Sequence, residues 1–325
     1  MKKFFKVYLP FTANELKRNL TYKGAFYLFI FCSLFGTFIN YFLWMAIYGS
    51  SSSVTLGGLT RQEMVVYVFM SYITAALSMI GISDNVSEDV VEGTVAMNLI
   101  KPIDYRLSLV FMAMGNVIYR FFAPCILVWI GLEVYKVQVL GLGITPISNI
   151  VLYLISVFFS FMIYVLFDFC FGMIAFFTTY IFGMLMAKDA LLSFLTGQLI
   201  PLSFFPEVIQ RVFDFLPFSS MVYAPTMIYL GKYSGNELMF VLFRQLVWVV
   251  ILYVLGSLIW KRVTKRLVVL GGLVYEEFEK IPSIIQGVGI SVFEDDCPVE
   301  GGFYNGTFWI PVFRAVGPCV LGSCV

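Results

Sequence analysis

Six long apolar runs constrain this chain more than any other feature of its sequence. They cover about residues 24–48, 63–82, 107–134, 148–177, 184–204 and 238–260. A helix needs about 20 apolar residues to cross the hydrocarbon core of a bilayer. Hydrophobic residues make up 60% of the 325-residue chain and charged residues 13%, whereas soluble domains carry about 25% charged residues. The sequence therefore predicts an all-α polytopic membrane protein with six transmembrane helices.

Basic residues indicate how these helices are oriented, because Lys and Arg concentrate in cytoplasmic loops. With the N-terminus inside, the inner segments hold twelve basic residues and the outer segments hold four. The inner residues are Lys2, Lys3, Lys6, Lys17, Arg18, Lys23, Lys101, Arg106, Lys261, Arg262, Lys265 and Arg266, and the outer ones are Arg61, Lys136, Arg211 and Lys232. We therefore expect both ends of the transmembrane domain to lie in the cytoplasm.

The two ends of the chain differ from the apolar domain over residues 24–268. Residues 1–23 are basic and amphipathic and predict a helix on the inner surface of the membrane. Within them Thr12 and Glu15 have the spacing of a capping box. Residues 269–325 form an acidic tail that contains Gly and Cys, and their sequence indicates no role.

Composition excludes several kinds of chemistry. The chain has no His, so a serine-hydrolase triad and a His-based metal site are excluded. A net charge of +1 gives no reason to expect a nucleic-acid partner. Gly231–Lys232 is the only Gly-Lys pair, but Tyr233 follows it and Thr226 stands where a P-loop needs its first glycine. We expect no enzyme activity and no bound cofactor or metal in this chain.

A short charged segment separates the second run from the third. Residues 88–107 read EDVVEGTVAMNLIKPIDYRL. Gly93 and Pro102 bracket a predicted two-turn helix, because proline disfavours helix at the residue before it. Val91, Val95 and Leu99 are spaced i, i+4 and i+8 and predict one apolar edge. A helix this short is marginal alone in water, so it lies on lipid headgroups or docks into a groove of a soluble partner.

Residues 201–234, between the fifth and sixth runs, combine apolar side chains with prolines. Pro201, Pro206, Pro217 and Pro225 exclude a continuous helix. The pattern predicts a re-entrant or interfacial hairpin on the outer face. Non-helical backbone at membrane depth must be shielded by protein or line a cavity.

Arg120 in the third run and Asp168 in the fourth are the notable charges within the predicted membrane region. Such residues normally face the bundle interior and are paired. One interpretation is a structural pair, and another places both on a substrate path. The sequence also permits a secondary transporter or channel that uses these two residues. Lys188 and Asp189 are expected at the inner membrane interface.

Over about residues 3–268 the chain resembles permease subunits of ABC type-2 exporters. One shared element is EGTVAMNLIKPIDYRL, with Gly93, Leu99, Lys101 and Pro102 in the matching places. The other is the outer element, whose matching residues are Gly197, Pro201, Phe205, Pro206, Leu216, Pro217, Phe218, Pro225 and Gly231. The number of spans, their orientation and the basic amphipathic N-terminus also fit this family.

The resemblance implies a six-helix permease in a bacterial cell membrane, paired with a second copy or a related permease. It implies that residues 88–104 form a coupling helix that contacts a separate ATPase subunit, which would bind ATP and Mg²⁺. The contact residues it implies are Glu92, Gly93, Val95, Leu99, Lys101 and Pro102. The expected function is export through a membrane path formed by residues 24–268. The sequence does not identify the exported compound.

Overall fold

A computed structural model describes residues 2–21, 23–51, 53–178 and 181–287. Its contacts divide the chain into two units, Met1–Val269 and Leu270–Val325. The first unit contains every element except the second part of the last helix. Most of the acidic tail predicted over residues 269–325 lies outside the described residues.

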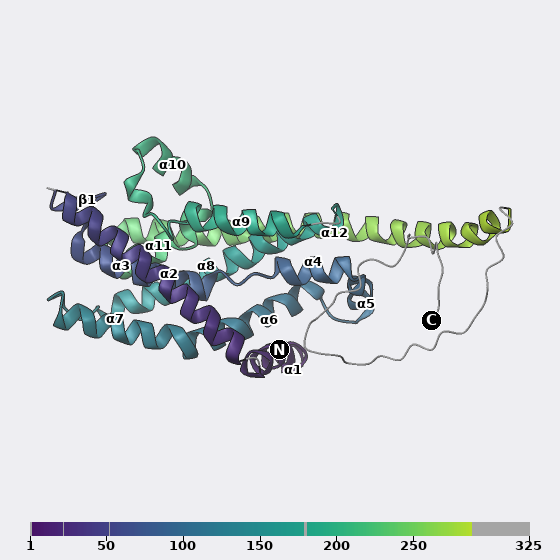
Figure 1. Ribbon diagram of the computed structural model, residues 1–325, viewed down its shortest axis with the longest axis horizontal. Helices are drawn as coiled ribbons and strands as arrows, with labels where there is room; N and C mark the ends of the chain where they lie inside the picture. The colour runs from purple at the N-terminus through teal and green to yellow at the C-terminus, as the bar shows by residue number, and fades with distance from the viewer. Residues whose placement is uncertain (1, 22, 52, 179–180, 288–325) are drawn as a thin grey trace, which may run out of the picture. The chain divides into compact units, whose positions relative to one another are not determined.

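The described residues are mainly helical, with one short antiparallel hairpin (Figure 1). The elements are α1 (Lys2–Thr21), α2 (Lys23–Ser50), β1 (Thr55–Leu56), β2 (Leu59–Thr60), α3 (Arg61–Ser78), α4 (Ser83–Val91), α5 (Thr94–Ile100), α6 (Tyr105–Arg120), the π-helical turn η1 (Phe121–Cys125), α7 (Ile126–Gln138), α8 (Ile147–Gly172), η2 (Met173–Phe176), α9 (Phe182–Leu195), η3 (Leu202–Phe204), α10 (Glu207–Phe215), η4 (Phe218–Ser220), α11 (Tyr223–Tyr229) and α12 (Gly235–Gly287). The all-α prediction is confirmed.

Four helical stretches among the described residues are long and apolar enough to cross a membrane. They are Ile30–Ser50, Arg61–Val91, Ile147–Phe176 and Gly235–Thr264, which correspond to the first, second, fourth and sixth predicted runs. The third run is divided by η1, which contains Pro124; proline removes a backbone donor and π-turns form where the helical ladder is interrupted. The fifth run is reduced to α9, of 14 residues. Six transmembrane helices therefore stay a prediction.

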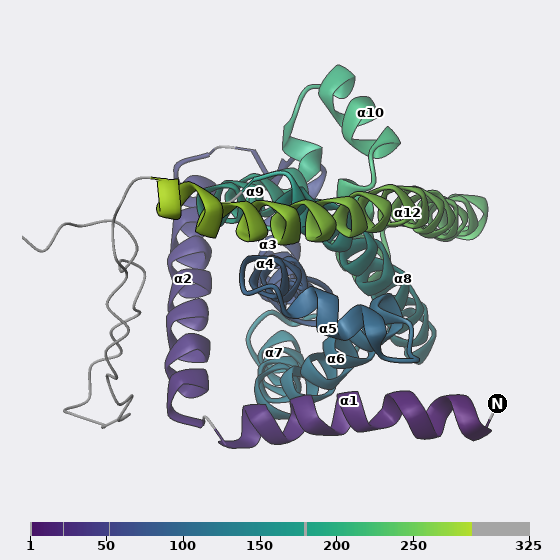
Figure 2. The same ribbon diagram turned by 90° about the vertical axis from the view of Figure 1, so that its right-hand side faces the viewer.

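Helix α1 packs along α6 through a polar face. The Thr12 hydroxyl donates to the Phe111 carbonyl at 2.7 Å, and the buried Glu15 carboxylate accepts from Asn116 Nδ2 at 2.9 Å. Gly115 permits this approach, since a Cβ there would lie 2.7 Å from the Thr12 carbonyl oxygen. Figure 2 looks along α4 and α7 and shows α1 lengthwise, so α1 runs crosswise to them.

The predicted capping box at Thr12 and Glu15 is wrong, because α1 is already helical from Lys2 and contains both residues in its interior. A capping box does form at the start of α3. Glu63 N–H donates to Thr60 Oγ1 at 3.3 Å, and Thr60 N–H donates to Glu63 Oε2 at 2.8 Å. The same four-residue pattern caps a helix only where the preceding chain is not helical.

Helix α3 is the centre of the bundle, and most of its residues are buried. It contacts α2, α7, α8 and α11. All seven residues of α11 are buried, and α11 packs on both α3 and α8. In contrast, α10 buries none of its residues. The proline-rich segment over residues 201–234 therefore contains an exposed amphipathic helix followed by a short helix that returns into the core.

The loops gather at opposite ends of the bundle (Figure 1). Helices α4 and α5 lie at the end where α1 also lies, and the Tyr8 hydroxyl bonds the backbone N–H of Asp104 there at 3.0 Å. The β1–β2 hairpin and α10 lie at the other end. At that end Lys232 pairs with Glu63 across 2.6 Å.

Candidate functional site

The charged segment between the second and third runs forms two short helices joined at Gly93. Gly93 has φ of +74°, a left-handed conformation that side-chain-bearing residues rarely adopt. Helix α5 spans Thr94–Ile100 and ends at Lys101, whose ψ of 139° is extended, as expected before Pro102. The helix predicted between Gly93 and Pro102 is thus confirmed.

The carboxylate of Asp89 joins the three helices of this region. It accepts from Thr94 Oγ1 at 2.7 Å, Asn98 Nδ2 at 3.2 Å and Tyr105 Oη at 2.6 Å. These donors belong to α5 and α6, whereas Asp89 lies in α4. Burial and this hydrogen bond both raise the pKa of Tyr105, so the phenol remains a donor. Sequence reasoning missed Asp89, because a lone acid on a short charged helix looks like a solvated residue.

The predicted apolar edge is wrong at Val95. Its side chain is only 3% exposed, whereas Val91 is 64% exposed. The left-handed turn at Gly93 breaks the helical register between the two residues, so the i, i+4 spacing no longer places them on one face. The exposed apolar side chains are Val91, Met97, Leu99 and Ile100, which we call the α4–α5 apolar surface. Glu92, Lys101 and Pro102 are exposed beside it.

Asp168 pairs with Lys188 and not with Arg120. The fully buried Asp168 carboxylate contacts the Lys188 ammonium and accepts from the backbone N–H groups of Ile82 at 2.6 Å and Ser83 at 2.7 Å. Lys188 also donates to Ser83 Oγ at 2.9 Å and lies 3.2 Å from Asp189. We call Asp168, Lys188 and Ser83 the charge junction.

The charge junction connects three helices. Asp168 from α8 supplies the N-terminal cap of α4, which has no side-chain cap of its own. A carboxylate at a helix N-terminus is stabilised by the unpaired amides and by the helix dipole. The Lys188 ammonium of α9 neutralises the Asp168 carboxylate. Lys188 is buried within the bundle and Asp189 is exposed, and their position at the inner membrane interface stays a prediction.

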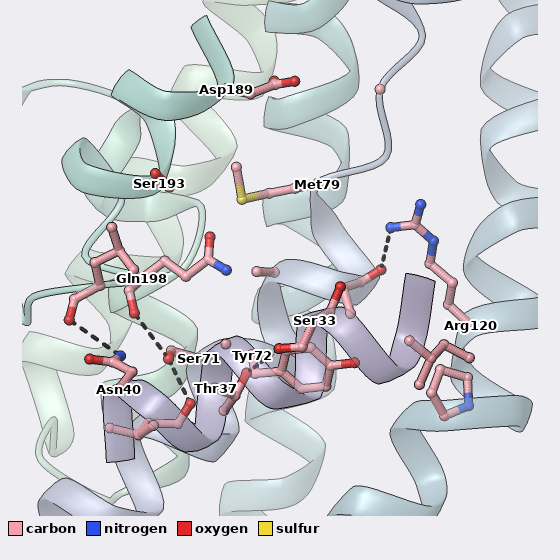
Figure 3. A pocket seen from close by; sticks show the side chains of 18 of the residues that line it. Ser33, Thr37, Asn40, Ser71, Tyr72, Met79, Arg120, Asp189, Ser193 and Gln198 are labelled. Carbon is pink, nitrogen blue, oxygen red and sulfur yellow. Dashed lines mark hydrogen bonds between the residues drawn. The ribbon is translucent and has the colours of Figure 1, made fainter. Parts of the chain in front are cut away.

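A cavity of about 630 Å³ lies between α2, α3, α8, α9 and the end of α6 (Figure 3). Arg120 lies on one wall, with its Nη1 at 3.4 Å from the Ala76 carbonyl. Asp84 and Asp189 also line it. The remaining polar lining consists of the side chains of Ser33, Thr37, Asn40, Ser71, Tyr72, Tyr164, Ser193 and Gln198. Of the residues that line the cavity, the sequence placed only Arg120 on a possible substrate path.

Three successive backbone carbonyls, those of residues 197–199, accept hydrogen bonds from side chains of α2 and α3, and Gln198 and Leu199 also line the cavity. Gly197 accepts from Tyr67 Oη at 2.6 Å and Gln198 from Ser71 Oγ at 3.4 Å. Leu199 accepts from Trp44 Nε1 at 3.4 Å and from Asn40 Nδ2 at 3.5 Å. We call residues 197–199 the carbonyl seal. Side chains of α2 and α3 thus satisfy the non-helical backbone of these residues.

Gly197 of the predicted outer element has a clear structural reason. Its φ is +82°, and a Cβ would lie 3.1 Å from both Tyr67 Oη and Tyr223 Cβ. Three of the prolines immediately precede helices: Pro201 precedes η3, Pro206 precedes α10 and Pro217 precedes η4. Pro225 lies in the first turn of α11, where a missing N–H leaves no bond unmade.

A second polar cluster joins α7 to α11. Glu133 contacts the Tyr229 hydroxyl and accepts from Thr145 Oγ1 at 2.6 Å. Lys136 lies 3.2 Å from Glu133. Among the described residues, no group of three or more His, Cys, Asp or Glu side chains is placed to hold a metal ion.

The chain was compared with known families and proteins. A family profile described as ABC-2 family transporter protein matches residues 34–271. This range includes the α4–α5 segment, the charge junction, the carbonyl seal and all of the cavity lining except Ile30 and Ser33. No curated protein matches the chain significantly. Since the profile covers well over half of the sequence, the chain belongs to the ABC-2 transporter family and is a multi-pass membrane transport component.

Proposed function

We propose that the chain is the permease subunit of an ATP-driven exporter. It forms the membrane path, works with a separate ATPase subunit, and pairs with a second copy or a related permease. ATP and Mg²⁺ are bound by the ATPase partner. The family match supports this proposal, because an ABC-2 permease is a transport component and not itself the ATPase.

The α4–α5 apolar surface is the observation that carries the proposal. A seven-residue helix such as α5 is unstable alone, yet α4 and α5 are held from behind by Asp89 and by the charge junction. Their outward side exposes Met97 at 66% and Ile100 at 80%. A rigidly held cluster of exposed apolar side chains is typical of a docking surface for another protein.

The charge junction offers a mechanical route from this surface into the bundle. Asp168 of α8 holds the first amides of α4, and Lys188 ties the same site to α9. A displacement of α4 and α5 by the ATPase must therefore move α8 and α9 or break buried charged hydrogen bonds. Because Asp84 and Asp189 line the cavity, the same displacement changes the cavity wall.

We place α4 and α5 on the cytoplasmic side of a bacterial cell membrane. The excess of Lys and Arg on the segments at that end favours this orientation. In this arrangement α6–α7 and α9 are the third and fifth spans, and both ends of the transmembrane domain are cytoplasmic. The β1–β2 hairpin and α10 then face outward.

Charge introduced on the α4–α5 apolar surface tests the docking role. Met97→Glu with Ile100→Glu should reduce co-purification of the ATPase by about tenfold or more, because central apolar contacts dominate interfaces. Ile144→Glu is the matched control, since Ile144 is 76% exposed but lies in the loop between α7 and α8. Val95 is unsuitable because a charge at this buried position would disrupt the segment itself. Undiminished co-purification of the double variant would refute the docking role.

The alternative of a secondary transporter that uses Arg120 and Asp168 has less support. Proton or ion coupling needs a carboxylate that the ion can reach, whereas Asp168 is fully buried and bonded to Lys188, Ile82 and Ser83. Transport by reconstituted vesicles separates the two functions. Uptake that needs ATP and the ATPase subunit supports the exporter, and uptake driven by a proton gradient with the permease alone supports the alternative.

A further inference from the structure

Helix α2 has two distinct faces. Ile30, Ser33, Thr37 and Asn40 recur at helical spacing and line the cavity. Its other side exposes large aromatic side chains, including Phe31 at 67%, Phe35 at 60% and Phe42 at 66%. Polar side chains in a membrane helix normally face protein or a water-filled space. The polar stripe of α2 therefore indicates that this wall of the cavity contacts water or the polar part of a ligand, while Ile30, Val68 and Met79 supply apolar lining.

Gly36 leaves open space beside α2. Gly36 lines the cavity, and a Cβ placed there would meet no atom within 4 Å. Close helix packing thus does not explain Gly36, since helices that touch at a glycine would leave no such room. A cavity of about 630 Å³ falls in the range of sites for small organic ligands, about 300–1,000 Å³.

Negatively charged side chains outnumber positively charged ones in the lining of the cavity. Its lining contains two carboxylates, Asp84 and Asp189, and one guanidinium, Arg120. Figure 3 shows Asp189 and Arg120 on different walls. Lys188 does not add to the lining, because it is buried against Asp168. A cleft with one excess negative charge and low-dielectric walls concentrates cations.

The carbonyl seal lies on one side of the cavity, where Figure 3 shows Gln198 and Asn40 away from Arg120. Asn40 and Ser71 both line the cavity and bond the seal. Asp84 and Asp189 lie toward the other end, beside the charge junction. A ligand entering past these acids would meet the hydrogen-bonding groups of α2 and α3 before reaching the seal.

We propose that this cavity is the binding chamber for the transported compound, and that the compound is an amphiphile with a positive charge and hydrogen-bonding groups. Its charge lies near Asp84 and Asp189, its polar groups bond Ser33, Asn40 and Gln198, and the carbonyl seal separates it from the outer side. This inference rests on the proposed function for the direction of transport. The binding step itself needs no ATPase.

Cysteine protection in lipid nanodiscs tests the chamber. Ser33→Cys, in a background whose six native cysteines are replaced by alanine, reports on access to the cavity. A water-soluble maleimide labels the introduced cysteine, and the rate of labelling is measured with and without a probe that could occupy the cavity. The three probes have equal chain length: dodecylammonium, dodecyl glucoside and dodecyl phosphate. We expect dodecylammonium to slow labelling about fivefold or more at a concentration well above its dissociation constant. Ser53→Cys, in the exposed loop before β1, corrects for effects on the bilayer surface.

Two substitutions locate the bound probe. Asp189→Asn should weaken dodecylammonium protection about threefold to fivefold, as expected for a partly exposed charge pair, while Glu207→Gln on exposed α10 should not. Gly36→Leu should fill the cavity and bring the ratio of labelling rates with and without probe to about one. Gly49→Leu is its matched control, because Gly49 lies on the same helix with equal free space but outside the cavity.

Equal protection by all three probes, or protection that survives Gly36→Leu, would overturn the proposal. Stronger protection by the glucoside or the phosphate would overturn the assignment of a cationic compound. ATPase co-purification, measured on the same preparations, tests the proposed function separately. Intact co-purification with no protection by dodecylammonium would refute the chamber alone.

Discussion

Replacing Lys188 by Met leaves the Asp168 carboxylate charged, fully buried and without its cation. Met has nearly the volume of Lys, so the change leaves no large cavity. Asp168 keeps two backbone donors, Ile82 at 2.6 Å and Ser83 at 2.7 Å. Removing one partner of a buried ion pair costs about 3–5 kcal/mol, mainly because the remaining charge is uncompensated.

Removing the carboxylate instead of the ammonium should destabilise the protein less. In Asp168→Asn, Lys188 still has Asp189 at 3.2 Å, and that carboxylate is 60% exposed and solvated. The amide oxygen that this substitution introduces can still accept from the α4 backbone. The double variant, which combines Lys188→Met with Asp168→Asn, has no buried charge at the junction, so we expect it to lie within about 2 kcal/mol of the wild type.

The measurement is denaturant unfolding in mixed micelles, followed by circular dichroism, for all four members of this cycle. Lys232→Met is the control, because the Lys232–Glu63 pair is partly exposed, at 31% and 25%, and should contribute about 1 kcal/mol or less. The reasoning is refuted if the double variant is as unstable as the two single losses added together. It is also refuted if Lys188→Met unfolds no more readily than the control.

Three further substitutions test other contacts. Asp89→Asn keeps the shape of the acid but weakens its three hydrogen bonds, so ATPase co-purification should fall severalfold while the melting temperature of the bundle changes little. Gly115→Val should displace α1 from α6, since even a Cβ would lie 2.7 Å from the Thr12 carbonyl oxygen; faster protease cleavage within α1 would show it, and an unchanged digest would count against the packing. Gly197→Ala should destabilise the carbonyl seal by about 1–3 kcal/mol because of its positive φ. Raised maleimide access to Ser71→Cys from the outer side is the readout, and unchanged access would contradict this role of the glycine.

Patterns that depend on neighbouring residues were read correctly from the sequence. Four of the six apolar runs correspond to helices that are long and apolar enough to cross a membrane, because such a helix needs only length and hydrophobicity. Gly93 and Pro102 were correctly read as the bounds of α5 because their effects are local. Glycine permits a positive φ, and proline lacks an N–H and restricts the ψ of the residue before it. The prolines of residues 201–225 correctly excluded a continuous helix for the same reason.

Patterns that depend on what surrounds a residue misled the prediction. The spacing of Thr12 and Glu15 matched a capping box as well as that of Thr60 and Glu63, but only the second pair follows non-helical chain. Val95 was assigned to an exposed edge because helical spacing was continued across Gly93. Pro124 lies in a π-turn between α6 and α7 that no periodicity signals.

The sequence alone determined that this chain is a membrane protein of long helices, with a short bounded helix after the second. Only the tertiary structure decided which charges meet, which face of α2 lines a cavity, and which side chains hold the carbonyls of residues 197–199. Hydrophobic length and glycine or proline geometry act within a few residues of the chain. In contrast, the pairing of Asp168 with Lys188 depends on the rotation and depth of two separate helices, which are set by the packing of the whole bundle.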